Sequence, residues 1–216
     1  MEKTQHIVIL AAGDFPTHRE AIALLVNADC VVCCDSAYEG YLRSGNDKGN
    51  CLVVGDGDSL PAETKRSLGD RWIHVAEQDY NDLHKAMSFA VSKFEIKNTK
   101  YTILGATGRR EDHTLGNISY LATFAEEYPG IEIEMLTDYG RFTVFRGSRI
   151  YDSFPGQQVS VFSMDSDKPL YSEGLKWPLD GLVPRRWWQA TLNESLAQEF
   201  TLSSAGWTVV FQNYLS

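Results

Sequence analysis

An apolar run that ends in two aspartates occupies residues 51–59, Cys51-Leu-Val-Val-Gly-Asp-Gly-Asp-Ser59. A few apolar residues bounded by glycine and charge are typical of a buried strand that stops at a turn. Comparable short runs occur along the first 137 residues, at His6–Ala11, Cys30–Cys34, Trp72–Val75, Tyr101–Leu104 and Ile131–Leu136. The pattern therefore predicts a series of buried strands.

Helical patterns lie between these strands. From Tyr80 to Tyr101 the apolar residues recur with helical spacing on one stripe, at Leu83, Ala86, Met87, Ala90, Val91 and Phe94. Asn81 is the expected N-cap of this helix, and a second helix is predicted to begin near Asp112. Alternating strands and helices predict an α/β domain with a mainly parallel sheet, which we place at residues 1–137.

The pattern changes after Asp138. Short β-branched or aromatic runs are separated by Gly, Pro, Ser and Asp, and they lie at Phe142–Phe145, Val159–Phe162, Glu199–Leu202 and Trp207–Phe211. Gly147-Ser148 is predicted to form a hairpin turn between two strands. We therefore expect a C-terminal antiparallel β-sandwich domain over residues 138–216, with no long helix.

Composition excludes several classes of protein. The chain has 216 residues, with 20 Lys and Arg against 29 Asp and Glu, so its net charge is −9. Such an acidic chain is not expected to bind nucleic acid, which requires a basic face, although it can bind nucleotides through a bridging cation. The apolar run Ile7–Ala12 is too short to span a bilayer and follows no basic leader. We expect a cytoplasmic protein that does not enter a membrane.

The four cysteines are expected to be reduced thiols of the core. Cys30 and Cys33 have the CxxC spacing, and Cys34 and Cys51 lie in similar apolar runs. No second CxxC or neighbouring His pair completes a zinc site, and alternate residues of a strand point to opposite faces. A metal or redox role is the less favoured alternative.

Acidic residues follow the predicted strands. Asp35 follows one strand, Asp56 and Asp58 follow the next, and Asp82 begins the amphipathic helix. Each aspartate alone is typical of a turn or a helix cap. Because ligands of α/β sheets bind beyond the carboxyl ends of the strands, the set favours a cation site instead. Oxygen ligands without His or Cys suit Mg²⁺, which would relieve the repulsion between the carboxylates.

A glycine-rich turn follows the fifth predicted strand, at Gly105-Ala-Thr-Gly-Arg-Arg-Glu-Asp-His113. Such a turn before a helix presents N–H groups to an anion, and Arg109 and Arg110 add positive charge. The turn matches neither the Walker P-loop nor GxGxxG. His113 and Asn117 share one helical face, either toward the site or as a surface pair.

These motifs together resemble those of the thiamine pyrophosphokinase family, in the same order and over nearly the whole chain. They are Asp35-Ser-Ala37, Gly55-Asp-Gly-Asp-Ser59, Gln78-Asp-x-x-Asp82-x-x-Lys85, Gly105-x-x-Gly-x-Arg-x-Asp-His113-x₃-Asn117 and Gly174-Leu-Lys-Trp-Pro178. The resemblance implies a Mg²⁺-dependent transferase that moves pyrophosphate from ATP to the hydroxyl of thiamine, giving thiamine diphosphate and AMP. It also implies an α/β ATP domain, a β-sandwich, and a homodimer whose thiamine sites straddle the subunit interface.

The resemblance also assigns roles to residues. It implies a Mg²⁺–ATP site at four carboxylates, namely Asp35, Asp56, Asp58 and Asp82. Phosphate or ribose contacts are implied for Gln78, Lys85 and Arg110. Asp112 would contact the aminopyrimidine of thiamine, and the partner subunit's Trp177 would stack on it. Further ligand contacts are expected at His113, Asn117 and Asn193. The residues expected to act in catalysis are Asp56, Asp58, Asp82, Lys85 and Arg110.

The mechanism implied is in-line attack of the thiamine hydroxyl on the β-phosphorus of ATP, with AMP leaving. Which aspartate accepts the proton stays open. The chain departs from the family pattern at Ser36 and Arg109, where glycine is usual, at Asn81, where threonine is frequent, and at Leu192, where serine is usual.

Two alternatives also remain. One is a nonenzymatic nucleotide or thiamine binder, and the other is a different Mg²⁺ enzyme, such as a nucleotide hydrolase or a kinase that makes ADP. The segment Gly174–Trp177 argues against both, because neither needs an aromatic platform on the β domain.

Overall fold

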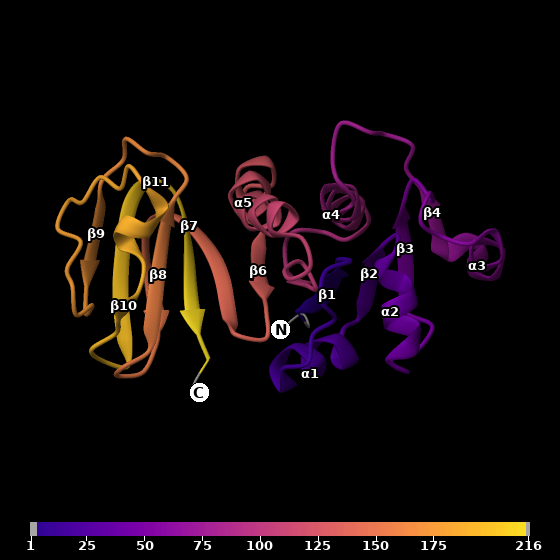
Figure 1. Cartoon of the computed structure of the whole chain (residues 1–216), viewed down its shortest axis with the longest axis horizontal. Coiled ribbons are helices and arrows are strands. Elements are labelled where there is room, and N and C mark those ends of the chain that lie inside the picture. The colour runs from indigo at the N-terminus through magenta and orange to yellow at the C-terminus, as the bar shows by residue number, and fades with distance from the viewer. Residues whose placement is uncertain (1–3, 215–216) are drawn as a thin grey trace. The chain divides into compact units, whose positions relative to one another are not determined.

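The computed structural model describes residues 4–214, and the chain divides into two compact units (Figure 1). The first unit comprises the residues up to Tyr120 together with Tyr128–Asp138. The second comprises Leu121–Glu127 and the residues from Tyr139 onward. Between residues 4 and 214, no helix has the length and apolarity needed to cross a membrane.

The first unit has a parallel sheet. In spatial order its strands are β6 (Glu132–Leu136), β5 (Thr99–Leu104), β1 (Gln5–Leu10), β2 (Cys30–Cys34), β3 (Cys51–Gly55) and β4 (Trp72–His74). Every neighbouring pair among these strands is parallel, so the predicted α/β fold is confirmed. The chain runs outward from β1 to β4 and then returns to place β5 on the other side of β1. Such a reversal of strand order opens a crevice beyond the carboxyl ends of the strands.

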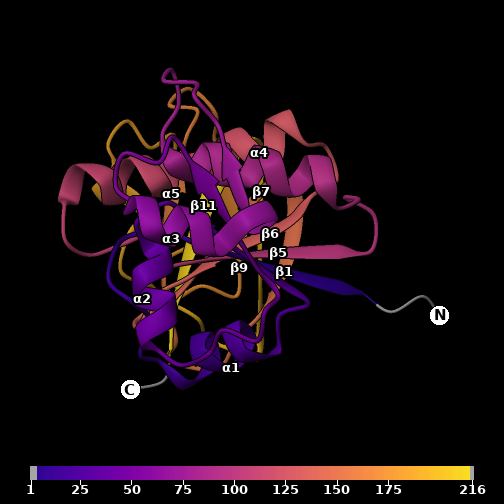
Figure 2. The ribbon, with the colours of Figure 1, turned by 90° about the vertical axis from the view of Figure 1, so that its right-hand side faces the viewer.

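Helices connect the strands of this sheet. They are α1 (Arg19–Asn27), α2 (Ala37–Arg43), α3 (Ala62–Leu68), the short 3₁₀ turn η1 (Gly69–Arg71), α4 (Asp82–Lys93) and α5 (Glu111–Glu127). Figures 1 and 2 show α4 and α1 on opposite faces of the sheet.

Helix α4 confirms the periodicity of its sequence. Leu83, Met87 and Ala90 are buried, as the apolar stripe predicts. The Oδ1 atom of Asn81 accepts a hydrogen bond from the His84 N–H at 3.0 Å, so the predicted N-cap is also confirmed. The cap fixes where α4 begins, and thereby the place of the residues of its first turn.

The cysteines are buried thiols, as predicted. All four are free and lie in β2 and β3. The Sγ atoms of Cys33 and Cys51 are 3.4 Å apart. Burial raises the pKa of Cys30 to about 11, so its thiol stays protonated at neutral pH.

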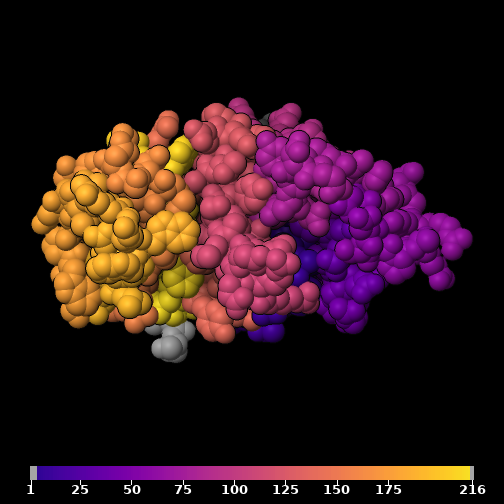
Figure 3. Space-filling model, turned by 45° about the horizontal axis from the view of Figure 1, so that its top comes forward, coloured from indigo at the N-terminus to yellow at the C-terminus, as the bar shows by residue number. Residues whose placement is uncertain are grey.

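The second unit is antiparallel. Its strands are β7 (Gly140–Asp152), β8 (Gln158–Ser163), β9 (Leu170–Glu173), β10 (Asn193–Glu194) and β11 (Glu199–Asn213), with a 3₁₀ turn η2 (Trp187–Ala190). Strand β11 pairs with β7 along one edge, while β9 and β8 pair with successive halves of its other edge. Buried side chains from β7, β8, β9 and β11 meet in one core, which includes Tyr151, Val161, Leu170, Phe200 and Val210. In Figure 3, the orange and yellow atoms belong to this unit.

The predicted hairpin turn at Gly147-Ser148 is wrong. Both residues lie inside β7, where they pair with Ser204 and Ser203 of β11. Gly147 has φ of 94°, and the register shifts between Ser204 and Thr208 on the opposing strand. The glycine thus accompanies a distortion of one long strand rather than ending it. The runs predicted as separate strands on either side of residues 203–206 are likewise two halves of β11.

Candidate functional site

A cavity of about 500 Å³ lies at the carboxyl ends of the strands of the first unit. Its wall includes Gly13 after β1, Ser36 after β2, Asp56 after β3 and Gln78 after β4. The first turn of α4 contributes Asp82 and Lys85, while Arg109, Arg110, His113 and Asn117 come from the glycine-rich turn and α5. The cavity therefore occupies the place that the reversal of strand order predicts for a ligand.

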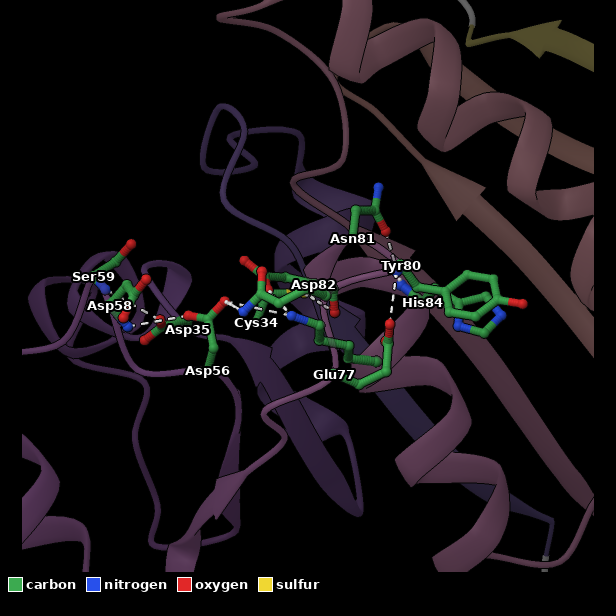
Figure 4. A network of polar contacts seen from close by, with 12 residues as sticks. Cys34, Asp35, Asp56, Asp58, Ser59, Glu77, Tyr80, Asn81, Asp82 and His84 are labelled. Carbon is green, nitrogen blue, oxygen red and sulfur yellow. Dashed lines mark hydrogen bonds and ion pairs between the residues drawn. The ribbon is translucent and has the colours of Figure 1, made fainter.

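Asp56 is the centre of the polar contacts in this cavity (Figure 4). Its Oδ2 atom accepts hydrogen bonds from Gln78 Nε2 at 3.2 Å and from Lys85 Nζ at 3.4 Å. Its Oδ1 atom accepts one from the Asp58 N–H at 3.1 Å. The Asp58 N–H is the main cause that lowers the pKa of Asp56. Asp56 is therefore a fixed anion at neutral pH.

Lys85 carries a buried positive charge. Its side chain is 3% exposed, and its Nζ atom lies 3.6 Å from Asp82 Oδ1 as well as 3.4 Å from Asp56 Oδ2. A buried ammonium group needs such partners because burial without them costs several kcal/mol. Burial raises the pKa of Asp82, although Lys85 opposes this shift. The three side chains place a buried cation between two carboxylates at the cavity wall.

Asp35 has an unsatisfied buried oxygen. The residue is 1% exposed, and its Oδ2 atom accepts a hydrogen bond from the Ser59 N–H at 3.3 Å. Its Oδ1 atom is buried and has no hydrogen-bond partner. Burial raises the pKa of this carboxyl group. A buried carboxylate oxygen without a partner is the kind of atom that a bound cation would satisfy.

The four aspartates do not gather around one point. Across the described chain, no three His, Cys, Asp or Glu side chains are grouped closely enough to ligate one metal ion. Asp58 is exposed, and it contacts Asp56 through its backbone N–H. Mg²⁺ is commonly bound by one or two carboxylates and completes its shell with water and phosphate oxygens. The arrangement fits that mode of binding better than a cage of four carboxylates.

Two loops at the edge of the cavity are held together by hydrogen bonds to backbone carbonyl groups. The Gly13 N–H donates to Gly105 O at 2.7 Å, and the Arg109 guanidinium donates to Ala12 O at 2.9 Å. A Cβ atom on Gly13 would lie 2.3 Å from Thr107 O, so this approach requires glycine. Arg109 has φ of 57°, in the left-handed region that favours glycine. A glycine at position 109 would adopt this conformation without strain, whereas Arg109 supplies the hydrogen bond to Ala12.

Arg110 and Asp112 pair with each other. The two side chains are exposed and form two hydrogen bonds, at 3.1 Å and 2.5 Å. The hydrogen bond from Arg110 lowers the pKa of Asp112 to about 2. The structure thus brings these predicted site residues together as one ion pair at the cavity edge.

His113 and Asn117, which share one face of α5, lie in different environments. Asn117 is buried, and its Nδ2 atom donates to Ala106 O at 2.8 Å while its Oδ1 atom accepts from Asn81 at 3.2 Å. It therefore ties the loop after β5 to the start of α4. His113 is exposed and lines the cavity.

The second unit has its own hollow, of about 340 Å³. Trp177, Leu192 and Asn193 are among the residues that line it. Trp177 is 53% exposed, and Lys176 Nζ lies 4.9 Å from the centroid of its indole ring. Leu192 has φ of 58°, and its side chain is also exposed. Sequence reasoning paired Trp177 and Asn193 with a ligand, and the structure places both beside this hollow.

Sequence reasoning missed the segment Ala11–Gly13, which lines the cavity of the first unit. The signal for it was a strand ending at a glycine. It also missed Tyr80, whose ring stacks on His84 at 4.0 Å between centroids. Tyr80 and His84 both occupy variable positions of the motif Gln78-Asp-x-x-Asp82-x-x-Lys85, so the motif does not predict their contact.

The fold and the cavity define a two-part protein in which an α/β unit with a polar, charged crevice precedes an antiparallel β unit. Residues 21–135 match the family model for the thiamin pyrophosphokinase catalytic domain, and residues 140–211 match the model for its substrate-binding domain. The chain belongs to the thiamin pyrophosphokinase family.

Relatives agree with this assignment, and solved structures share the fold. Thiamine pyrophosphokinase 1 of Oryza sativa subsp. japonica is 29% identical over 142 residues, which cover 60% of this chain and 52% of the rice protein. The match thus spans about half the length of that relative. A thiamin pyrophosphokinase family protein from Enterococcus faecalis has a TM-score of 0.77 at 22% identity, with 98% of this chain and 100% of that one covered. Thiamin pyrophosphokinase from Candida albicans has a TM-score of 0.76 at 17% identity, covering 98% of this chain and 90% of that one. These likenesses confirm the fold, with an N-terminal α/β part and a C-terminal β part.

Proposed function

We propose that this protein transfers pyrophosphate from ATP to the hydroxyl of thiamine and so makes thiamine diphosphate and AMP. One observation carries the proposal from the site itself. A buried lysine, Lys85, lies between Asp56 and Asp82 in a cavity at the carboxyl ends of a parallel sheet. A fixed cation beside carboxylates suits a substrate that brings both a polyphosphate and a metal ion. Family membership supplies thiamine as the acceptor.

Mg²⁺ fits the residues of this cavity. The available donors are carboxylate oxygens, and Asp35 has a buried oxygen without a partner. Asp56 and Asp82 are the proposed ligands, with Asp35 and Asp58 supporting them. When bound, the ion would neutralise charge on the phosphates.

The chain's own residues then position the substrates. Lys85 and Arg110 are proposed to hold phosphate oxygens, and Gln78 orients Asp56 through its hydrogen bond. The attack is proposed to be in-line on the β-phosphorus, with AMP leaving. Catalysis of this kind rests on positioning and charge stabilisation. One of the aspartates of the cavity accepts the proton of the thiamine hydroxyl.

Thiamine is proposed to use groups from both parts of the sequence. Asp112 would contact the aminopyrimidine, and the partner subunit's Trp177 would stack on it in a homodimer. An exposed indole suits a flat, cationic substrate, since its face attracts positive charge. Light scattering on the purified protein tests the dimer, and a strict monomer would contradict this arrangement.

The test of the activity is a product assay with ATP, Mg²⁺ and thiamine, resolved by ion-exchange chromatography. The proposal expects AMP and thiamine diphosphate in equal amounts. Formation of ADP with thiamine monophosphate would identify an ordinary kinase instead. Bound substrates without any product would identify a binding protein.

Ser36 and Arg109 both line the open cavity, so these departures from the family pattern do not fill it.

A further inference from the structure

The side chain of Asn193 is committed to the backbone of Trp177. Asn193 is 4% exposed, although it lies beside the hollow of the second unit. Its Nδ2 atom donates to Trp177 O at 2.7 Å, and its Oδ1 atom accepts from the Trp177 N–H at 3.2 Å. The same Oδ1 atom accepts from the Glu194 N–H at 2.9 Å. One amide group therefore binds both polar groups of the Trp177 backbone.

This contact lies where backbone pairing between two segments ends. The Leu196 N–H donates to Gly174 O, and the Lys176 N–H donates to Glu194 O, both at 2.9 Å. Pro178 follows Trp177 and has no N–H to continue the pattern. At Trp177 the side chain of Asn193 takes the place of a pairing strand. Asparagine suits this role because its side chain carries a donor and an acceptor in one plane.

The residue after Asn193 acts on the indole ring of the same tryptophan. Glu194 Oε2 pairs with Lys176 Nζ at 3.0 Å, and that ammonium group lies 4.9 Å from the ring centroid of Trp177. Asn193 thus binds the backbone of Trp177, and Glu194 pairs with the Lys176 ammonium group that lies over its ring. An exposed indole fixed in this way loses less conformational freedom when a flat ring stacks on it.

We propose that Asn193 is a positioning residue that holds Trp177 in place for the acceptor substrate, rather than a residue that contacts the ligand itself. The proposal rests on the proposed function, because it takes thiamine to be the molecule that stacks on Trp177. It replaces the ligand contact that sequence reasoning expected at Asn193. The proposal requires that the loss of Asn193 weaken thiamine binding by changing the position of the Trp177 indole.

The first test follows the indole directly and needs no substrate. The full chain is labelled with 5-fluorotryptophan, and the Trp177 signal among the five tryptophans is assigned in ¹⁹F NMR with Trp177→Phe. We expect Asn193→Ala to move or broaden that signal. Asn193→Asp, which keeps the shape and loses the donor, should do the same. Asn213→Ala is the matched control, because Asn213 also binds backbone in this unit, through the Gln158 N–H at 3.1 Å. An unmoved Trp177 signal in both Asn193 variants would overturn the proposal.

The second test uses thiamine kinetics. We expect Asn193→Ala to raise the KM for thiamine roughly tenfold, with little change in the KM for ATP. In a Trp177→Ala background the same substitution should have no further effect, because the two residues act as one unit. A further rise in that background would show that Asn193 contacts thiamine itself, which contradicts the proposal. If the wild type makes no thiamine diphosphate, the proposed function fails, and the NMR signal still decides whether Asn193 fixes Trp177.

Discussion

Lys85 Nζ lies 3.4 Å from Asp56 Oδ2, although the two residues are 29 positions apart and belong to different elements. Asp56 follows β3, and Lys85 lies in the first turns of α4. Lys85 is buried, so its charge has little access to solvent and depends on Asp56 and Asp82. A buried cation aimed at carboxylates that would also meet a metal ion is suited to bind polyphosphate.

Replacing Lys85 with methionine should therefore lower turnover about 100-fold or more, because a preorganised charge is lost from the transition state. Turnover is measured at saturating ATP and thiamine, and folding by circular dichroism. Lys93→Met is the matched control, since Lys93 lies exposed at the end of the same helix. Near-normal turnover in a folded Lys85→Met variant would remove Lys85 from the site.

Asp56→Asn should lower turnover about 100-fold and raise the Mg²⁺ concentration needed for half-maximal rate. The substitution keeps the size of the side chain and removes the charge that faces Lys85 and Gln78. Asp58→Asn changes an exposed side chain and should lower turnover and raise the Mg²⁺ requirement less than Asp56→Asn does. The rate is measured against Mg²⁺ concentration for both variants. An Asp56→Asn enzyme with the wild-type Mg²⁺ dependence would show that Asp56 does not bind the ion.

Leu192→Gly should stabilise the protein by about 0.5 kcal/mol, because relief of about 1–2 kcal/mol of left-handed strain exceeds the roughly 0.5–1 kcal/mol entropy cost of glycine. Leu192 has φ of 58° with a 72% exposed side chain, so glycine removes backbone strain at little loss of packing. Leu196→Gly is the paired control, because Leu196 is also exposed but does not have a positive φ. That control should destabilise the protein by roughly 0.5–1 kcal/mol through the entropy of glycine. Urea unfolding measures both changes, and equal destabilisation would argue against strain at Leu192.

Much of the first unit was predictable because its signals are local. The apolar stripe of α4 and the cap at Asn81 depend on residues a few positions apart, and both are confirmed. The rule that ligands lie beyond the carboxyl ends of parallel strands then led from Asp35 and Asp56 to the cavity. Asp56 lines that cavity, while Asp35 is buried and is not among the residues that line it.

The wrong turn at Gly147 and the unforeseen backbone contact of Asn193 both involve partners distant in sequence. Gly147 resembles a turn in its local sequence, and the pairing with Ser204 is what makes it part of a long strand. The amide of Asn193 binds the backbone of Trp177, a contact that no local pattern in the sequence predicts. Such pairings depend on the register between segments, which residue spacing alone does not determine.

The stability of the protein in acid depends on Asp138. Its Oδ1 atom accepts from the Thr17 and His18 N–H groups at 2.8 Å and 2.9 Å, and its Oδ2 atom accepts from the Thr17 hydroxyl at 2.5 Å. Burial alone would raise the pKa of Asp138, but these hydrogen bonds outweigh it and lower the pKa below the ordinary 3.8. The charged carboxylate therefore stabilises the fold above pH 3.8, and this contribution is lost as the pH falls through the lower pKa of the folded state.

Asp138→Asn should accordingly cost about 1 kcal/mol at pH 7, and the difference from wild type should shrink as the pH falls below about 3.8. Urea unfolding at pH 7 and at pH 3 measures the two free energies. Asp70→Asn, at an exposed aspartate of the same unit, controls for the change in net charge. A difference between Asp138→Asn and wild type that stays constant from pH 7 to pH 3 would show that the charge of Asp138 contributes nothing. The loss of stability in Asp138→Asn would then come from altered hydrogen bonds to Thr17 and His18. Such a loss does not depend on the ionisation of Asp138 and is therefore independent of pH.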